Sequence, residues 1–357
     1  MRTYKIASIP GDGIGAEVIS SGITVLEALA EKALDIEFLI DNFNWGSEYY
    51  KSQGSMMPDD GLEQIRSHDA ILFGSAGHPD IPDHITLWGL RLAICQPFDQ
   101  YANVRPARLL PGIRSPLSSG GEKIDWVIVR ENSEGEYAGI GGRVHQGQPI
   151  EVATDVSMLT RVGVKRIMKF AFSLAQSRPR KLLTVVTKSN AQRHAMVMWD
   201  EIAAEVSYQF PDVNWDKMLV DAMTTRMVLK PDSIDTVVAT NLHADILSDL
   251  AAALAGSLGV APTANLNPER KFPSMFEPIH GSAFDITDQG IANPIGTFWS
   301  IVMLLEHLGE ESSAKRLMNA IEKVTADPNF HTPDLGGNAR TIDVTTAVID
   351  VIQKTNN

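Results

Sequence analysis

The apolar positions of this chain follow two alternating patterns. Short continuous apolar runs, bounded by polar or turn residues, predict strands that are buried on both faces of a sheet. These runs lie at residues 4–9, 70–73, 126–129, 182–186 and 236–239. Longer segments in which apolar residues recur every three or four positions predict helices near 15–33, 160–178, 193–208, 242–255, 295–308, 312–325 and 343–354. The alternation predicts an α/β fold whose largely parallel sheet is covered by helices.

Two Gly-rich stretches, at 135–147 and 255–268, interrupt this pattern. The first is followed by residues 150–156, where apolar and polar side chains alternate as they do in a half-exposed strand. This combination predicts an arm or hairpin at a subunit interface. The length of 357 residues favours about two domains, although no shift in composition marks a linker between them.

The charge balance and the single cysteine exclude several classes of protein. The chain has 31 Lys and Arg against 44 Asp and Glu, and a net charge of −13 argues against a nucleic-acid partner. Cys95 is the only cysteine, which excludes a disulfide framework and suits the reducing cytoplasm. The N-terminus lacks the apolar core of a signal peptide, and no apolar run approaches the roughly 18 residues of a membrane span. We therefore expect a cytoplasmic protein without a membrane partner.

A pair of carboxylates is the clearest candidate metal site. Asp245 and Asp249 are four residues apart in a predicted helix, so both lie on one helical face. Their mutual repulsion would be relieved by a cation, and carboxylate oxygens suit Mg²⁺ or Mn²⁺. The alternative is a solvated acidic face near the start of a helix, and the spacing alone does not decide between the two.

Four further side chains could carry chemistry, and three of them lie at strand ends, where an α/β sheet presents its ligand crevice. Arg105 and Arg130 lie at the ends of strand-like segments, and a guanidinium group can bind a carboxylate with two hydrogen bonds. Each arginine taken singly fits a structural ion pair equally well. Lys188 closes the run at 182–186 and could act as a base if its pKa were lowered, and the phenol of Tyr137 could carry a proton.

Two loops are candidates for a nucleotide cofactor. Residues 11–16 fit the spacing G-x-G-x-x-A of a dinucleotide-binding fingerprint. However, Pro10 and Asp12 place a rigid bend and a negative charge where a pyrophosphate would approach, so a tight strand-to-helix turn is the alternative. In the polar loop at 277–285, the carboxylate of Asp285 could accept hydrogen bonds from ribose hydroxyls and repel a 2′-phosphate.

Taken together, these motifs resemble the metal-dependent, β-decarboxylating 2-hydroxyacid dehydrogenases of the isocitrate/isopropylmalate dehydrogenase family, over essentially the whole chain. The motifs are PGDGIG at 10–15, NVRP at 103–106, VRENSEGEY at 129–137, TKSN at 187–190, DILSDL at 245–250, and EPIHGSAFDI with GIANP at 277–294. The variants WGSEYY (45–50), MMPDD (56–60), LWG (87–89), FDQY (98–101) and NLNPER (265–270) are most similar to the tartrate and D-malate dehydrogenase branch.

The resemblance implies a two-domain, isopropylmalate-dehydrogenase-like α/β fold, not a Rossmann domain, with central sheets flanked by helices. It implies a discontinuous cofactor domain at 1–102 and 256–357, and a central domain at 103–255 that holds substrate and metal. A dimerising arm is expected near 138–157. The partners implied are a small 2-hydroxy acid and a second copy of the chain, with active sites shared between the two subunits of a homodimer.

The resemblance also implies an NAD-dependent oxidation, with β-decarboxylation, of a hydroxy acid of the D-malate or tartrate type. The metal, Mg²⁺ or Mn²⁺, would be held by Asp245, Asp249 and Asp221 of the partner subunit, with K⁺ a further candidate ion. Lys188 would be the base and Tyr137 the proton donor, and Arg105, Arg130 and Asn190 would bind substrate. NAD would lie on a loop that includes His280, Gly281, Ser282, Ala283, Asp285, Ile286 and Asn293.

The sequence departs from the family at one substrate position. The family has a substrate-binding arginine ten residues before Arg105, and this chain has Cys95 there, which makes Cys95 a candidate substrate-site residue by its position. We hypothesise that Arg91, one helical turn earlier, takes over an anionic contact; the alternative is an exposed arginine that does not reach the site. The departure leaves two alternatives to D-malate or tartrate oxidation: the same chemistry on a different substituted 2-hydroxy acid, or a non-catalytic regulatory paralogue.

Overall fold

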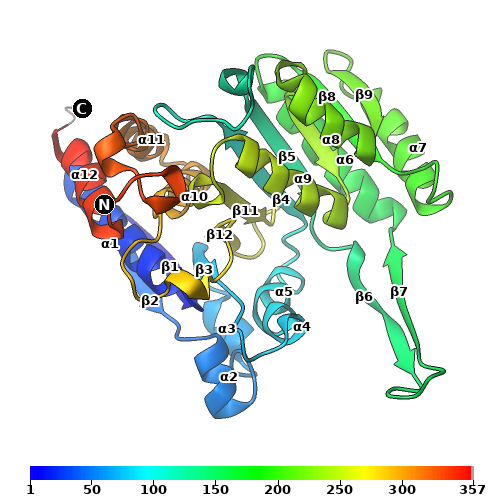
Figure 1. Ribbon diagram of the computed structural model, residues 1–357, viewed down its shortest axis with the longest axis horizontal. Coiled ribbons are helices and arrows are strands. Elements are labelled where there is room, and N and C mark those ends of the chain that lie inside the picture. Colours follow the sequence, from blue (N-terminus) through cyan, green and yellow to red (C-terminus); the bar gives the residue numbers. More distant parts are fainter. Residues whose placement is uncertain (355–357) are drawn as a thin grey trace. The chain divides into compact units, whose positions relative to one another are not determined.

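The structure is a computed structural model that describes residues 1–354. It divides into two compact units, drawn together in Figure 1. Unit 1 comprises Met1–Gln100, Leu109–Ser118 and the described chain from Ala252 onward. Unit 2 comprises Tyr101–Arg108 and Ser119–Ala251.

Unit 1 has a mixed sheet with the strand order β2-β1-β3-β12-β11. Its strands are β1 (Arg2–Gly11), β2 (Ile36–Asn42), β3 (Ala70–Ser75), β11 (Pro262–Leu266) and β12 (Ser274–Pro278). All neighbours are parallel except β11 and β12, which are antiparallel. Its longer helices are α1 (Gly15–Ala33), α10 (Ile295–Leu308), α11 (Glu311–Thr325) and α12 (Thr341–Lys354), and its shorter ones are α2 (Ser47–Gln53), α3 (Gly61–Ile65), α4 (Asp83–Thr86) and α5 (Leu92–Cys95).

Strand β3 shows why continuous apolar runs predict central strands. Ala70 and Leu72 pack into the core formed with α1, α10, α11 and α12. Ile71 and Phe73 point to the opposite face and pack against a second core. Because successive side chains of a strand point to opposite faces, a strand covered on both sides needs apolar residues at every position.

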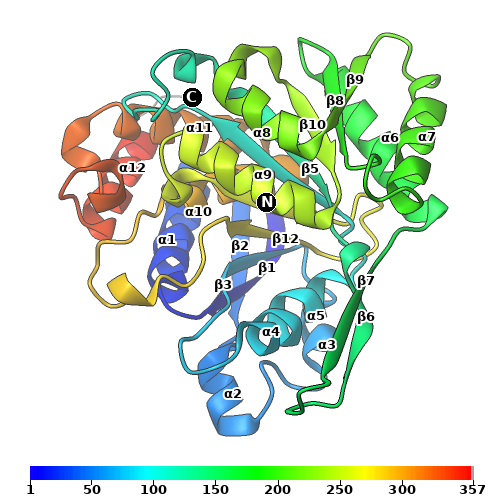
Figure 2. The ribbon, with the colours of Figure 1, turned by 45° about the vertical axis from the view of Figure 1, so that its right-hand side comes forward.

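Within unit 2 the strands follow the order β4-β5-β10-β8-β9. Its strands are β4 (Ala102–Arg108), β5 (Asp125–Glu131), β8 (Leu182–Thr187), β9 (Asn214–Leu219) and β10 (Thr236–Ala239). β4 and β5 are antiparallel and the other neighbours are parallel. The helices are α6 (Arg161–Ser177), α7 (Ala195–Ser207), α8 (Val220–Leu229) and α9 (Asn241–Leu254), and Figure 2 shows α9 next to β5.

A separate antiparallel hairpin extends from unit 2 (Figure 1). It is formed by β6 (Gly135–Val144) and β7 (Val152–Met158), which pair with each other and with no other strand in the described chain. Ile140, Val144 and Val152 are exposed along it. The hairpin occupies the segment where the sequence predicts an arm.

The predicted strands and long helices are confirmed, and so is the α/β class. The strand pairing is mixed rather than wholly parallel, because β11 and β4 run against their neighbours β12 and β5. Residues 109–118 were expected in the central domain but belong to unit 1. The reason is burial: Leu110 and Ile113 lie in the core beside α10 and α11. No helix of the described chain is long and apolar enough to span a membrane.

His307, in the last turn of α10, makes the stability of unit 1 depend on pH. Its ring packs against Phe276, with 5.5 Å between the ring centroids. Burial, helped by the charge of Arg270, lowers the pKa of His307 to about 4. In the unfolded chain this pKa is about 6.5, so between these two values the unfolded state binds the extra proton and folding loses stability as pH falls.

We therefore expect the urea midpoint of the wild type to fall as pH is lowered from about 6.5 to about 4.5, and to fall less in His307→Gln. His84→Gln, which removes an exposed histidine, is the matched control and should keep the wild-type slope. Equal slopes for the wild type and His307→Gln would contradict this account.

Candidate functional site

Two buried arginines of unit 2 lie on one face of its sheet. Asn103 on β4 is directly opposite Arg130 on β5, and Arg105 lies two residues further along the same face. Arg105 is held by its neighbours: Nε donates to Asn103 Oδ1 (2.8 Å), and Nη1 donates to Ser248 Oγ (2.6 Å) on α9. The strand pairing and the helix together fix the direction of this guanidinium group.

Asp245, on α9, connects the two arginines. Its Oδ1 lies 3.2 Å from Arg105 Nη1 and also pairs with Arg130 Nη1. The Nε of Arg130 donates to Asn241 Oδ1 (2.8 Å). The guanidinium group of Arg130 lies 5.2 Å from the ring centroid of Tyr137, whose hydroxyl is 3.5 Å from Asp245 Oδ2. One carboxylate thus contacts both predicted substrate arginines and the predicted proton donor.

Asp249 lies one turn further along α9 and is the second carboxylate of this group. Its Oδ1 is 4.0 Å from Arg105 Nη1, and its side chain is more exposed than that of Asp245. Burial raises the pKa of Asp249, Arg105 opposes the rise, and the charge of Asp245 adds to it. Two carboxylates with exposed edges on one helical face are a donor set that fits Mg²⁺ or Mn²⁺.

Lys188 and Asp221 form a separate pair in unit 2. Lys188 follows β8, Asp221 lies in the first turn of α8, and the ammonium group contacts Asp221 Oδ1. This hydrogen bond lowers the pKa of Asp221. Asn190 is exposed on the same loop as Lys188. In the described residues of one chain no three His, Cys, Asp or Glu side chains form a metal site, so Asp221 is not brought to Asp245 and Asp249 within the chain.

The Gly-rich turn at residues 11–15 in unit 1 is a structural turn. The carboxylate of Asp12 points inward, is 5% exposed, and accepts hydrogen bonds from Ser47 N, Ser47 Oγ and Gly77 N at 2.6–2.8 Å. Because this carboxylate points inward, the turn offers no site for a phosphate group. The interpretation of residues 11–16 as a dinucleotide-binding fingerprint is therefore wrong, and the alternative, a tight strand-to-helix turn, is correct. The turn meets a second loop at Ile14, whose N–H donates to Ser282 O (2.9 Å).

That second loop lines a cavity of about 510 Å³ in unit 1. Five of the predicted cofactor residues line it: His280, Ala283, Asp285, Ile286 and Asn293. Burial lowers the pKa of His280, so its ring is neutral, and its Nε2 is buried without a hydrogen-bond partner. The Asp285 carboxylate is exposed at the edge, and Ile14 adds an apolar wall. An apolar wall, a neutral ring nitrogen and a carboxylate are a set that fits a nucleoside.

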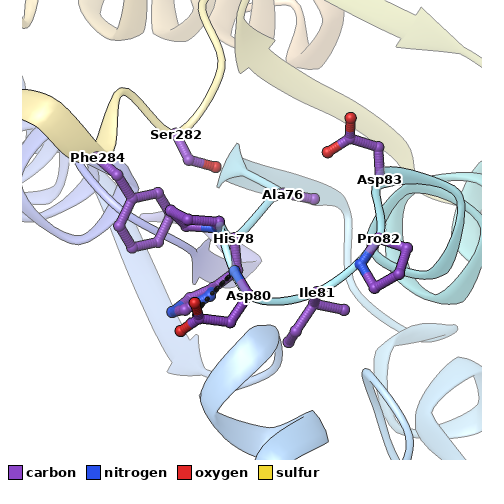
Figure 3. Close-up of a pocket in the computed structure, with 10 residues that line it drawn as sticks. Ala76, His78, Asp80, Ile81, Pro82, Asp83, Ser282 and Phe284 are labelled. Carbon is purple, nitrogen blue, oxygen red and sulfur yellow. Dashed lines mark hydrogen bonds and ion pairs between the residues drawn. The ribbon is translucent and has the colours of Figure 1, made fainter.

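The same loop also lines a second cavity of about 570 Å³ in unit 1, shown in Figure 3. The segment from Ala76 to Asp83 forms one wall, and Ser282 and Phe284 form the other. The rings of His78 and Phe284 meet edge to face, with 4.7 Å between their centroids. Ser282 Oγ is buried without a hydrogen-bond partner. Gly281, the remaining predicted residue, is exposed on the loop.

Cys95 and Arg91 are both held by contacts inside unit 1. Cys95 is 1% exposed and belongs to an apolar core with Phe98 and Met275, so this thiol is a core side chain. Arg91 is neither exposed nor pointing to solvent. Its Nε lies 2.7 Å from Glu277 Oε1, and its side chain is 12% exposed.

Sequence reasoning missed the residues that hold the predicted ones in place. Ser248 lies three residues after Asp245 on the same helical face, and Asn103 lies two residues before Arg105 on the same strand face, so spacing could have found both. Asp334 gave no such signal. It lines the cofactor cavity and accepts hydrogen bonds from Asn293 Nδ2 (3.0 Å) and Ser257 Oγ (2.5 Å), but it comes from a distant loop.

Comparison with known proteins gives full-length similarities. The sequence model of the isocitrate/isopropylmalate dehydrogenase family matches residues 5–352. A probable tartrate dehydrogenase/decarboxylase TtuC' of Agrobacterium vitis is 69% identical over 357 residues, covering 100% of this chain and 99% of that protein. D-malate dehydrogenase (decarboxylating) of Escherichia coli strain K12 is 49% identical, covering 99% of each. The crystal structure of isocitrate dehydrogenase from Methylococcus capsulatus superposes with a TM-score of 0.88 at 34% identity, covering 98% of this chain and 100% of that one.

Proposed function

The chain belongs to the isocitrate/isopropylmalate dehydrogenase family, and from this premise we propose that it oxidises and decarboxylates a small 2-hydroxy acid of the D-malate or tartrate type, with NAD and Mg²⁺ or Mn²⁺. Family membership makes the chain an enzyme, an oxidoreductase of the decarboxylating dehydrogenase class, and not a non-catalytic paralogue. The observation that carries the proposal is the contact of Asp245 with Arg105, Arg130 and Tyr137.

Asp245 and Asp249 would hold the divalent cation together with Asp221 of the partner subunit. When bound, the cation would polarise the C2 oxygen of the substrate and balance its charge. Because Lys188 contacts Asp221 within one chain, the subunit that supplies Asp221 to an active site would supply Lys188 to the same site. The exposed apolar side chains of the β6–β7 hairpin support a homodimer, since apolar surface of this kind marks interfaces.

The side chains of unit 2 would divide the work on the substrate. Arg105 and Arg130 would bind the carboxylates of the substrate, which would replace Asp245 as the anionic partner of the two arginines. Lys188, in its neutral form, would take the proton of the C2 hydroxyl as hydride leaves C2. The resulting 2-keto acid has its C3 carboxylate beta to the carbonyl, so the bond from C3 to that carboxyl carbon breaks and CO₂ leaves. Tyr137 would then give its phenolic proton to C3 of the enolate.

NAD would lie on the loop at residues 280–293 and supply the hydride acceptor. The loop's own residues set the choice of dinucleotide. Asp285 would accept hydrogen bonds from ribose hydroxyls, and its charge would repel a 2′-phosphate, so NAD is favoured over NADP. His280 and Ile286 line the same cavity and would contact the nucleoside.

The proposal predicts metal-dependent NADH formation on a panel of D-malate, the tartrates, isopropylmalate and isocitrate. We expect turnover of D-malate or a tartrate with Mn²⁺ or Mg²⁺, release of one CO₂ per NADH, loss of turnover with EDTA, and a much lower rate with NADP. Turnover confined to another 2-hydroxy acid would keep the chemistry and contradict the substrate assignment. Turnover that survives EDTA would contradict the role of Asp245 and Asp249.

A shared active site predicts complementation between inactive subunits. Lys188→Met and Asp245→Asn homodimers should each lose activity, by on the order of 10²–10⁴-fold for the lysine. A hybrid dimer of the two, purified through two different tags, keeps one intact site and should show about half of the wild-type activity.

The matched control is the hybrid of Lys188→Met with Asp221→Asn. Both residues reach the same site from the same subunit, so each site of this hybrid lacks one of them and it should stay inactive. A Lys188→Met and Asp245→Asn hybrid as inactive as its parents would mean that each site is built from one chain.

A further inference from the structure

Three polar side chains in unit 1, two of them buried, are connected by hydrogen bonds. Arg91 lies at the end of the π-helical turn Leu87–Arg91, between α4 and α5. Its Nε donates to Glu277 Oε1 (2.7 Å), and its Nη2 donates to Asn265 Oδ1 (3.2 Å). Asn265 Nδ2 donates in turn to Glu277 Oε1 (2.7 Å). The set joins the helical turn to β11 and β12.

Glu277 is the residue that this set stabilises. Its side chain is 6% exposed, and a carboxylate at that depth is retained only with a charged or hydrogen-bonding partner. Its backbone carbonyl accepts a hydrogen bond from Ser300 Oγ (2.7 Å). The main chain of Glu277 is thus fixed from α10, and its side chain is fixed by Arg91 and Asn265.

Glu277 also lies next to the loop proposed to bind NAD. β12 ends at Pro278, and His280, the first cofactor residue, comes two residues later. Between these two residues, Ile279 N donates a hydrogen bond to Ala261 O (2.9 Å), which connects this part of the chain to the segment before β11. The direction in which the loop leaves the sheet therefore depends on the end of β12.

We propose that Arg91 is a positioning residue for the cofactor loop and acts through Glu277, not as a ligand of the hydroxy acid. The inference rests on the proposed function, because it takes the loop at 280–293 as the NAD site. A contact between Arg91 and a substrate carboxylate would withdraw the arginine from Glu277 and leave a buried charge unpaired. The π-helical turn is a rare geometry found often at functional sites, and here it presents Arg91 to β11 and β12.

The test measures binding of NADH without hydroxy acid, by fluorescence titration, beside the KM of the hydroxy acid. For Arg91→Met we expect the Kd of NADH to rise about tenfold, a change of about 1.4 kcal/mol, while the KM of the hydroxy acid stays within about twofold. Arg91→Lys, which keeps the charge, should recover part of the NADH affinity. Arg66→Met removes an exposed arginine paired with Glu63 and should change neither value.

Two outcomes would overturn the inference. In the first, the KM of the hydroxy acid rises and NADH binding is unchanged, as a substrate contact requires. In the second, only the melting temperature falls, as a purely structural role requires. If Arg91→Met does not fold, the double variant Arg91→Met, Glu277→Gln is measured in its place, because it removes both charges of the pair. An NADH affinity equal to that of the wild type in the double variant would also overturn the inference. If the wild type itself binds no NADH, it is the proposed function that fails.

Discussion

The structure of unit 2 depends on the neutralisation of two buried guanidinium groups. Arg105 and Arg130 are 6% and 2% exposed, and charges at that depth are retained only when they are paired and hydrogen-bonded. Asp245 pairs with both, and Asn103, Asn241 and Ser248 satisfy further N–H groups. Two arginines and two aspartates make the group neutral overall. A divalent cation and a dicarboxylate could enter together without changing that balance, since each would pair with the opposite charge.

Much of the fold and the outline of the site follow from local sequence patterns. The run at 70–73 predicts a strand covered on both faces, and β3 is one. The spacing of Asp245 and Asp249 predicts two carboxylates on one helical face, and α9 presents them so. The resemblance to the family is confirmed by a match to its sequence model over residues 5–352. These predictions succeed because each depends on residues close together in the chain.

Other positions depend on contacts that are distant in the sequence. For Cys95 and Arg91, on neighbouring turns, whether each side chain lies in a core, in solvent or in an ion pair is decided by β11 and β12, nearly two hundred residues later. The position of residues 109–118 in the chain suggests the central domain, but the burial of Leu110 beside α10 and α11 places them in unit 1. The burial and the contacts of such residues are determined by tertiary packing, which a local sequence pattern does not predict.

The central claim is that Asp245 pairs either with the two arginines or with a cation. When substrate carboxylates bind the arginines, the Asp245 carboxylate becomes available to the metal. Affinities linked in this way must be reciprocal. The most direct measurement is an electron paramagnetic resonance titration of Mn²⁺, with and without D-malate and in the absence of NAD. The account predicts that D-malate tightens Mn²⁺ binding in the wild type, and that Asp245→Asn abolishes the effect. Mn²⁺ affinity that is the same with and without the hydroxy acid would contradict it.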